Sequence, residues 1–162
     1  MATAAWYDWI SMDDLQRLDH WLEPLLRQLS PGQQRQLARQ IALHLRKANQ
    51  QTMAAQQSPD GQAWTPRKNR SRDARGRLRQ GPMFKKLRTA RHLRAQVLGN
   101  AAVVQFMGRA ERLARIHHFG LRDRVSPGGA EITYPVRELI GISDEQLEQI
   151  TDLALQFLTQ DL

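Results

Sequence analysis

The chain has 162 residues and a net charge of +8, and its 41% hydrophobic and 25% charged content is ordinary for one globular domain. It contains no cysteine, which excludes disulfides, thiolate catalysis and cysteine-ligated zinc, and which fits a reducing cytosol. No apolar run approaches the length of a membrane span, and the first residues lack the basic segment of a secretory signal, so we expect neither.

The first third of the chain is predicted to be helical. Leucines at helical spacing from Leu15 to Leu29 indicate a first helix, which Pro24 kinks or restarts. Ser30 and Pro31 provide an N-cap and a proline at the first helical position, so a second helix begins here and continues to about Gln57. Its length of about 40 Å suggests packing across a whole domain or against a neighbouring subunit.

A turn at residues 58–61 opens a loop that contains Trp64 and leads into the most basic part of the chain. From Arg67 to Arg94, twelve of twenty-eight residues are Lys or Arg and one is acidic, which gives a local charge of +11. The first half of this stretch has few apolar residues and contains Gly76, Gly81 and Pro82. We expect residues 67–80 to form a flexible arm that orders against a partner.

The second half of the chain mixes helical and strand signals. Residues 83–93 have helical spacing, whereas residues 96–99 and 101–106 are short and apolar around a Gly-Asn pair, which predicts a hairpin or two adjacent strands. A helix is expected over 109–117, a short strand over 131–134, and a last helix after the cap at Ser143. The sequence thus predicts an α+β fold, with N-terminal helices, a small antiparallel sheet, a C-terminal helix and a long basic loop.

We expect a single domain over residues 1–162. Within it, residues 1–57 form a helical region, residues 58–82 the basic loop or arm, and residues 83–162 an α+β core.

Charge is divided along the chain. Residues 7–29 hold five acids and two bases, the middle is basic, and residues 138–162 hold six acids and no base. Opposed patches of this kind suit head-to-tail contact between copies. The alternative, that the acids decorate solvated helix faces, is slightly favoured by sequence alone.

No catalytic constellation is present. His117 and His118 are adjacent, so they point to different sides of a helix, and neither has HExxH spacing or a matching carboxylate. One of the pair is expected to pack in a core or an interface at the end of its helix, and metal ligation is the less favoured alternative. The glycines form neither a GxGxxG motif nor a P-loop. We therefore predict a binding or structural role, no enzymatic activity, no cofactor and no metal.

Several aromatic residues lie where a periodic core pattern does not explain them. Trp64 either pins its loop to the core, the commoner role, or acts as an interface hot spot. Trp6, Tyr7 and Trp9 either dock on a neighbour or pack on their own core. The candidate interface anchors are Trp6, Tyr7, Trp9, Trp64, His118 and Phe119.

The basic stretch also has the electrostatics for contact with nucleic acid. Arg75, Arg77 and Arg79 alternate and would share one side of an extended chain, but no aromatic residue lies between Arg67 and Arg79 to stack on bases. Contact with DNA would therefore be directed at the backbone and independent of sequence. The candidate contacts to DNA or a protein partner are Arg67, Lys68, Arg70, Arg72, Arg75, Arg77, Arg79, Lys85 and Lys86.

The order of these motifs resembles the phage virion morphogenesis, or tail completion, family of contractile-tailed phages. It comprises QQSPDGQAWTPRK, the Arg-rich loop, MFKKLRTARHLRAQVLGNAAVVQF, RIHHFG and YPVRELIGISDEQLEQI. The resemblance covers roughly Leu15 to Leu158, and its most specific pieces are residues 58–67, 118–120 and 134–145. Val136 and Arg137 depart from the family's commonest Arg-Pro-Phe-Leu-Gly form, which leaves the local strand geometry open.

The resemblance implies a structural protein of the tail neck in the virion, a tail terminator or head-tail joining protein, assembled in the host cytoplasm. It implies a homo-oligomeric ring, usually six-fold, with tail tube or sheath proteins and head-tail connector proteins as partners, possible non-specific contact with phage DNA, and no membrane. The alternative from the residues alone is a free, sequence-independent nucleic-acid-binding protein.

Overall fold

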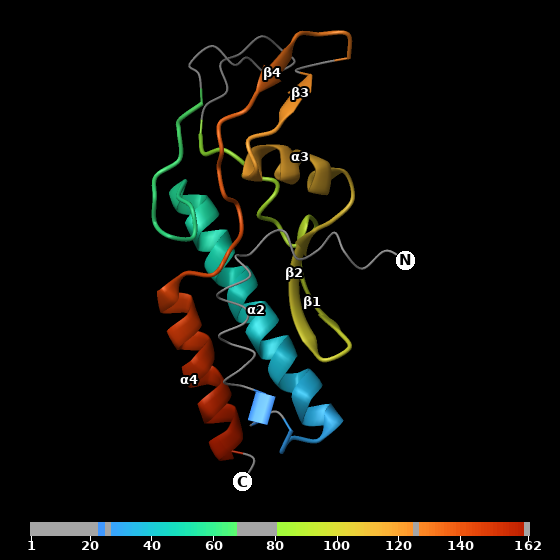
Figure 1. Ribbon diagram of the computed structural model, residues 1–162, viewed down its shortest axis with the longest axis vertical. Coiled ribbons are helices and arrows are strands. Elements are labelled where there is room, and N and C mark those ends of the chain that lie inside the picture. The colour runs from blue at the N-terminus through green and yellow to red at the C-terminus, as the bar shows by residue number, and fades with distance from the viewer. Residues whose placement is uncertain (1–22, 25–26, 68–80, 125–126, 161–162) are drawn as a thin grey trace.

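The computed structural model describes residues 23–24, 27–67, 81–124 and 127–160, and it has the expected α+β architecture (Figure 1). In chain order the elements are α2 (Pro31–Ala55), β1 (Leu93–Leu98), β2 (Ala101–Phe106), α3 (Arg109–His118), β3 (Arg122–Arg124), β4 (Glu131–Thr133) and α4 (Asp144–Gln160). Within these ranges, no helix is both long and apolar enough to cross a membrane. The first predicted helix falls mostly outside the described residues.

The long helix α2 forms where the sequence predicts it. Ser30 and Gln33 make a reciprocal capping box, with Pro31 at the first helical position. The helix ends at Ala55 because Gln56 adopts a left-handed conformation, with φ of 60°. One stripe of the helix is buried along its whole length, and it comprises Leu37, Ala38, Ile41, Ala42, Leu45, Asn49 and Met53.

The predicted hairpin is confirmed, and it begins earlier than expected. β1 and β2 pair antiparallel in a register that sets Leu93 opposite Phe106 and Leu98 opposite Ala101, across a two-residue turn. Gly99 has φ of 63°, the left-handed conformation that such a turn requires.

The predicted helix over 83–93 is wrong, because residues 83–92 form consecutive turns. Phe84 has φ of 61°, which is incompatible with a helix, and the amide nitrogen of Met83 donates to Gln56 Oε1 at 2.7 Å. The turns still bury Met83 and Leu87. The apolar spacing of this segment therefore marks its buried residues, although the backbone is not helical.

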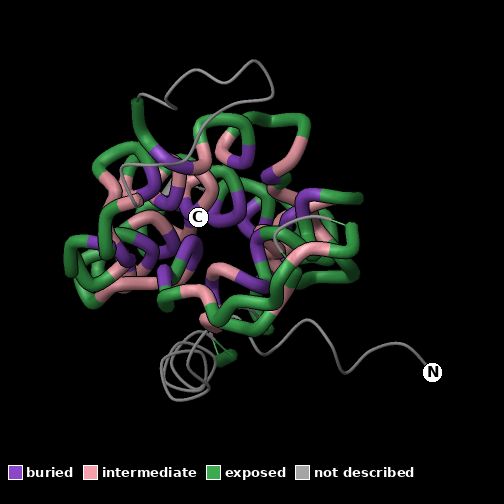
Figure 2. Tube along the Cα trace, turned by 90° about the horizontal axis from the view of Figure 1, so that it is seen from above, coloured by how far each residue is buried: buried purple, intermediate pink, exposed green. Residues whose placement is uncertain are grey.

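Two hydrophobic clusters lie along α2. The upper cluster in Figure 1 comprises Met53, Trp64, Met83, Leu87, Leu93, Phe106, Ala110, Ala114, Leu139 and Ile140. The lower cluster, between α2 and α4, comprises Leu29, Leu37, Ile41, Leu45, Ile150, Ala154 and Phe157. Val104 of β2 packs against both clusters. Figure 2 shows the buried positions, in purple, gathered toward the inside of the molecule.

The two later helices match their predictions. α3 ends one residue beyond the expected His117, and α4 opens on the predicted cap. There, the amide nitrogen of Gln146 donates to Ser143 Oγ, and the amide nitrogen of Ser143 donates to Gln146 Oε1, both at 3.2 Å.

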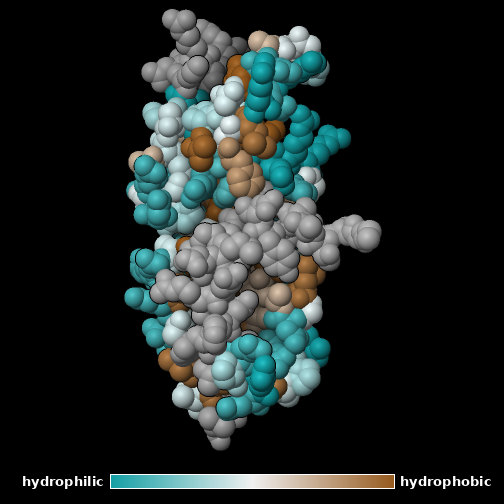
Figure 3. Space-filling model, in the orientation of Figure 1, coloured by the Kyte–Doolittle hydropathy of each residue, from teal (hydrophilic) through white to brown (hydrophobic). Residues whose placement is uncertain are grey.

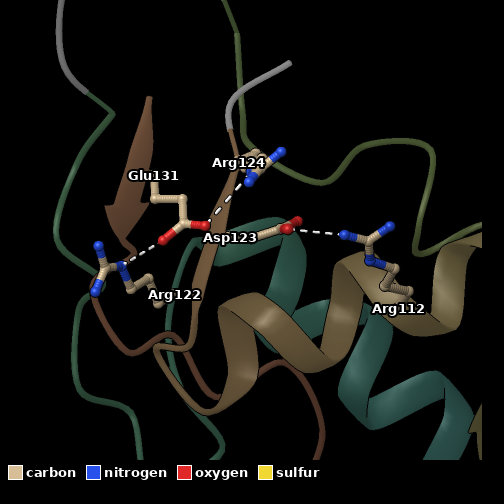
Figure 4. A network of polar contacts seen from close by, with 5 residues as sticks. All are labelled: Arg112, Arg122, Asp123, Arg124 and Glu131. Atoms are coloured by element: carbon tan, nitrogen blue, oxygen red, sulfur yellow. Dashed lines mark hydrogen bonds and ion pairs between the residues drawn. The ribbon is translucent and has the colours of Figure 1, made fainter. Parts of the chain in front are cut away.

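The strands β3 and β4 form a separate two-stranded ribbon (Figure 1). The strand expected at 131–134 is confirmed as β4, whereas β3 has no counterpart among the predictions. Arg122 and Arg124 both pair with Glu131, at 3.0 and 3.4 Å, and Arg112 of α3 pairs with Asp123 at 2.7 Å (Figure 4). Each of these exposed pairs adds at most about 1 kcal/mol, so the network orients the ribbon more than it stabilises it.

Replacing Leu37 with Ala tests the lower cluster. Leu37 is 1% exposed, so its truncation leaves a cavity between α2 and α4 and should lower the free energy of unfolding by about 2–5 kcal/mol. Leu43→Ala is the matched control, because Leu43 lies on the same helix and is 48% exposed; it should change stability by less than about 0.5 kcal/mol. Urea unfolding followed by circular dichroism measures both, and equal losses would contradict the assignment.

Candidate interaction site

The three most specific sequence motifs meet at one place in the structure, which we call the motif junction. It is formed by the loop 56–67, the end of α3 at 117–121, and the extended segment 134–141. Four rings make a chain of edge-to-face contacts across it, from Trp64 to Phe84, His117 and Tyr134. Their centroids are 5.5, 4.8 and 4.7 Å apart, spacings at which aromatic pairs attract.

Trp64 is held in the junction by its own loop. Its amide nitrogen donates to the Gln56 carbonyl at 2.9 Å, and its indole nitrogen donates to Ser58 Oγ at 3.1 Å. Trp64 and Ser58 are 7% and 8% exposed. This burial supports the interpretation of Trp64 as the residue that pins the loop to the core, and favours that role over contact with a partner.

A buried arginine ties the junction together. Arg137 is 5% exposed, its Nε donates to the Thr65 carbonyl at 2.9 Å, and its Nη1 lies 3.4 Å from His117 Nδ1. Burial first, and then the nearby charge of Arg67, lower the pKa of Arg137. The segment around Val136 and Arg137, whose geometry the sequence left open, is extended without forming a strand, and the Arg137 side chain fixes it to the Thr65 carbonyl.

The adjacent histidines do point in different directions, as expected. His117 faces Arg137, whereas His118 is 6% exposed and its Nδ1 accepts a hydrogen bond from the amide nitrogen of Leu139 at 3.1 Å. Burial lowers the pKa of both to about 4, and the charge of Arg137 contributes at His117. Both rings are therefore neutral near pH 7. No group of three or more potential metal ligands occurs among the residues that the structure describes.

Asn49 links α2 to the chain just before α4. Its Oδ1 accepts from the amide nitrogen of Gly141 at 2.8 Å, and its Nδ2 donates to the carbonyls of Gly141 and Leu45 at 3.1 and 2.8 Å. The side chain is 2% exposed. A Cβ at Gly141 would lie 2.7 Å from Pro59 Cγ, so the backbone can approach the loop this closely only with glycine.

A second feature, the basic groove, is open to solvent at the surface of α2. It is an open groove of about 750 Å³ between α2 and the turns at 83–92. Its cations are Lys47, Lys85, Lys86 and Arg88. The amide of Gln50 fixes its width, because Gln50 Nε2 donates to the Arg88 carbonyl at 2.5 Å. This preformed cationic surface is the best candidate for binding an anionic partner.

The predicted site residues are distributed unevenly over these features. Lys85 and Lys86 line the basic groove, Arg67 is half-buried beside the junction, and His118 is buried within it. Phe119 is half-buried against the His118 ring, with the Arg115 guanidinium 5.6 Å from its centroid. The remaining candidates lie outside the described residues: Trp6, Tyr7, Trp9, Lys68, Arg70, Arg72, Arg75, Arg77 and Arg79.

Sequence reasoning missed Lys47 and Arg88 as partners in the groove, and Asn49 and Arg137 as links in the core. Lys47 and Arg88 are far apart in the chain, and no local pattern joins them. Asn49 carried a weak signal, since it is a polar residue on the apolar stripe of α2.

Apolar side chains also reach the surface near the β3–β4 ribbon. Figure 3 shows brown residues among teal ones in the upper part of the molecule, where Leu121, Ile132 and Val136 are 39%, 40% and 59% exposed. Val136 Cγ2 would lie 2.7 Å from a Cβ at Gly120, which has φ of 63°, so only glycine fits beneath this residue.

Replacing Asn49 with Asp tests the link to α4. The variant keeps the shape of the side chain but loses the donor to two carbonyls and buries a charge, so stability should fall by about 3 kcal/mol. Gln40→Glu, at an exposed position of the same helix, is the matched control and should stay within about 0.5 kcal/mol. Chemical denaturation of the three proteins near pH 7 measures the difference, and a neutral Asn49→Asp would show that the link is dispensable.

The histidines predict a pH dependence. Because the folded pKa values of about 4 lie below the ordinary 6.5, the unfolded chain binds more protons between these limits, and stability should fall as the pH drops from about 6.5 toward 4. His118→Gln keeps an acceptor for the Leu139 amide but cannot titrate, so its stability should fall less than that of the parent. His44→Gln is the control outside the junction. Denaturation near pH 7 and near pH 5 measures the slopes, and identical slopes for the parent and His118→Gln would refute the assignment.

Comparisons with known proteins agree with the motif order. Residues 13–159 match the family model of the phage virion morphogenesis family. The chain is 34% identical over 149 residues to the tail completion protein S of Escherichia phage P2, an alignment that covers 91% of this chain and 99% of that protein. No solved structure matches the chain.

Proposed function

The chain belongs to the phage virion morphogenesis family, and from that premise we propose that it is a non-enzymatic assembly protein that completes a phage tail and joins it to the head. The observation that carries the proposal is the 34% identity to a protein named for tail completion, over almost the full length of both chains. The junction supports it as well, because His118 is buried, His117 is half-buried, and both are neutral and engaged in structural contacts.

We further propose that the working form is a closed homomeric ring, six-fold in symmetry, at the neck of the virion. Its partners would be tail tube or sheath proteins on one side and head-tail connector proteins on the other. Support comes from the uneven charge along the chain, since unlike patches favour heterologous contacts, and heterologous contacts that close give rings. The candidate contacts are the basic groove and the Arg-rich segment from Arg67 to Arg79.

A sequence-independent nucleic-acid-binding protein is the second candidate. The observation in its favour is the same concentration of cations, which would suit the DNA backbone as well as an acidic protein. The two candidates predict different results when the cations are removed from an otherwise stable protein, because only the assembly protein is needed to join heads and tails.

The triple variant Arg75→Gln, Arg77→Gln, Arg79→Gln tests the proposed role of the Arg-rich segment. It removes three charges from residues that the sequence predicts to be exposed, so folding should survive while the head-tail joint weakens. In a complementation assay, infectious yield should fall and electron micrographs should show filled heads beside separate tails. Arg35→Gln, Arg39→Gln, Arg109→Gln is the matched control, since these arginines are exposed and remote from the segment in sequence.

Two outcomes would count against this prediction. Normal yields of joined particles from a stably expressed triple variant would make the charge of the segment incidental. Joined particles in the absence of the chain altogether would remove the assembly function itself.

A further inference from the structure

Some charged residues in the described part of the chain form ion pairs with one another, and others do not. Glu131 pairs with two arginines, and Asp123 pairs with a third. The structure gives no ion pair, within its described ranges, to the cations of the basic groove or to the acids of α4. The groove residues are positively charged, and the α4 residues are negatively charged.

The acids of α4 form a stripe. Glu145, Glu148 and Asp152 are exposed and lie at i, i+3 and i+7, so they share one face of the helix. The opposite face carries Ile150, Ala154 and Phe157, which are buried against α2. We call the exposed face the acidic stripe.

The helix dipole explains only the beginning of the stripe. Asp144 and Glu145 lie in the first turn, where negative charge is stabilising, but this effect fades within that turn. Glu148 and Asp152 lie beyond it, four residues apart, and like charges at this spacing destabilise a helix. A lone subunit therefore bears an electrostatic cost that a cationic surface would relieve.

Within the described residues of one subunit, no acid of the stripe forms an ion pair with a cation of the groove. α4 packs on the buried stripe of α2 through Leu37, Ile41 and Leu45. Gln50 and Ala54 line the groove from the face of α2 opposite Ile41 and Leu45. Lys47 and Gln51 lie nearer to α4, on the same face as His44, whose Nε2 lies 3.0 Å from Gln149 Oε1. Hydrogen bonds between the two walls of the groove fix their separation. They join Gln50 to the Arg88 carbonyl and Gln56 to Met83.

We propose that the acidic stripe of one copy docks in the basic groove of the next. The inference rests on the proposed function, because it names the contact through which copies would join in the ring. Four cations face three acids on preformed surfaces, so the match requires no refolding of either side. The contact joins unlike patches, so each copy still offers one free groove and one free stripe until a ring closes.

Charge reversal tests the pairing. The groove variant is Lys47→Glu, Lys85→Glu, Lys86→Glu, which makes the groove negative, and the stripe variant is Glu148→Lys, Asp152→Lys, which makes the stripe positive. Each should weaken self-association at least about tenfold in sedimentation velocity on nuclease-treated protein, because like charges then face each other. An equimolar mixture should regain association, since each groove then meets a stripe of opposite sign in alternating copies.

Matched controls change the same charge elsewhere. Arg35→Glu, Arg39→Glu, Arg109→Glu is the control for the groove variant, and Glu111→Lys, Glu138→Lys is the control for the stripe variant; all five residues are exposed and outside both surfaces. Both controls should associate as the parent does. Circular dichroism and unfolding midpoints establish that every variant is folded.

Infectious yield supplies a second readout that works even when the free protein is monomeric. Either reversed variant alone should lower the yield in a complementation assay, and co-expression of the two should restore it. Unchanged association and yield in both variants, or failure of the mixture to recover, would overturn the docking and leave the tail-assembly proposal intact. Salt-sensitive binding of a DNA duplex that the groove variant abolishes, with no rescue by the stripe variant, would assign the groove to nucleic acid instead.

Discussion

The double hydrogen bond between the side chain of Asn49 and the backbone of Gly141 connects the two halves of the structure. It fixes residues 134–143 against α2, which places Arg137 and Leu139 in the motif junction on one side and begins α4 on the other. The buried Asn49 amide satisfies both the N–H and the carbonyl of Gly141. A shift of this segment along α2 would break both hydrogen bonds. The close approach of Gly141 to Pro59 extends the same constraint to the loop that holds Trp64.

Elements whose caps, turns and apolar spacing lie within a short stretch of sequence could be predicted from the sequence alone. The Ser30 cap and the apolar stripe predicted α2, the Gly-Asn turn predicted the hairpin, and the Ser143 cap predicted α4. The turns at 83–92 were misassigned because their apolar spacing fits a helix, whereas long-range contacts impose a positive φ at Phe84 and tie Met83 to Gln56. Tertiary contact overrides propensity in such segments.

The candidate site was less accessible to sequence reasoning. Lys85 and Lys86 were found because the cations cluster in the chain, but the groove also needs Lys47, which α2 brings to it. Arg137 is a charged residue in a core, and its partner carbonyl at Thr65 lies 72 residues away. No periodicity encodes such a pair. The motifs that are most specific to the family therefore describe how the subunit is held together, while the exposed charges are spread over segments with weaker patterns.

The length of α2 has a mechanical consequence. One helix of 25 residues contributes buried side chains to both hydrophobic clusters, and beyond Gly32 near its start it contains neither glycine nor proline. A continuous helix without such breaks resists bending, because kinks require an interruption of its hydrogen bonds. Helix α2 therefore offers no point of bending between the two clusters, and a load applied at the loop after Ala55 is transmitted along the helix toward Pro31. A helix of this stiffness keeps the two hydrophobic clusters at a fixed distance from each other.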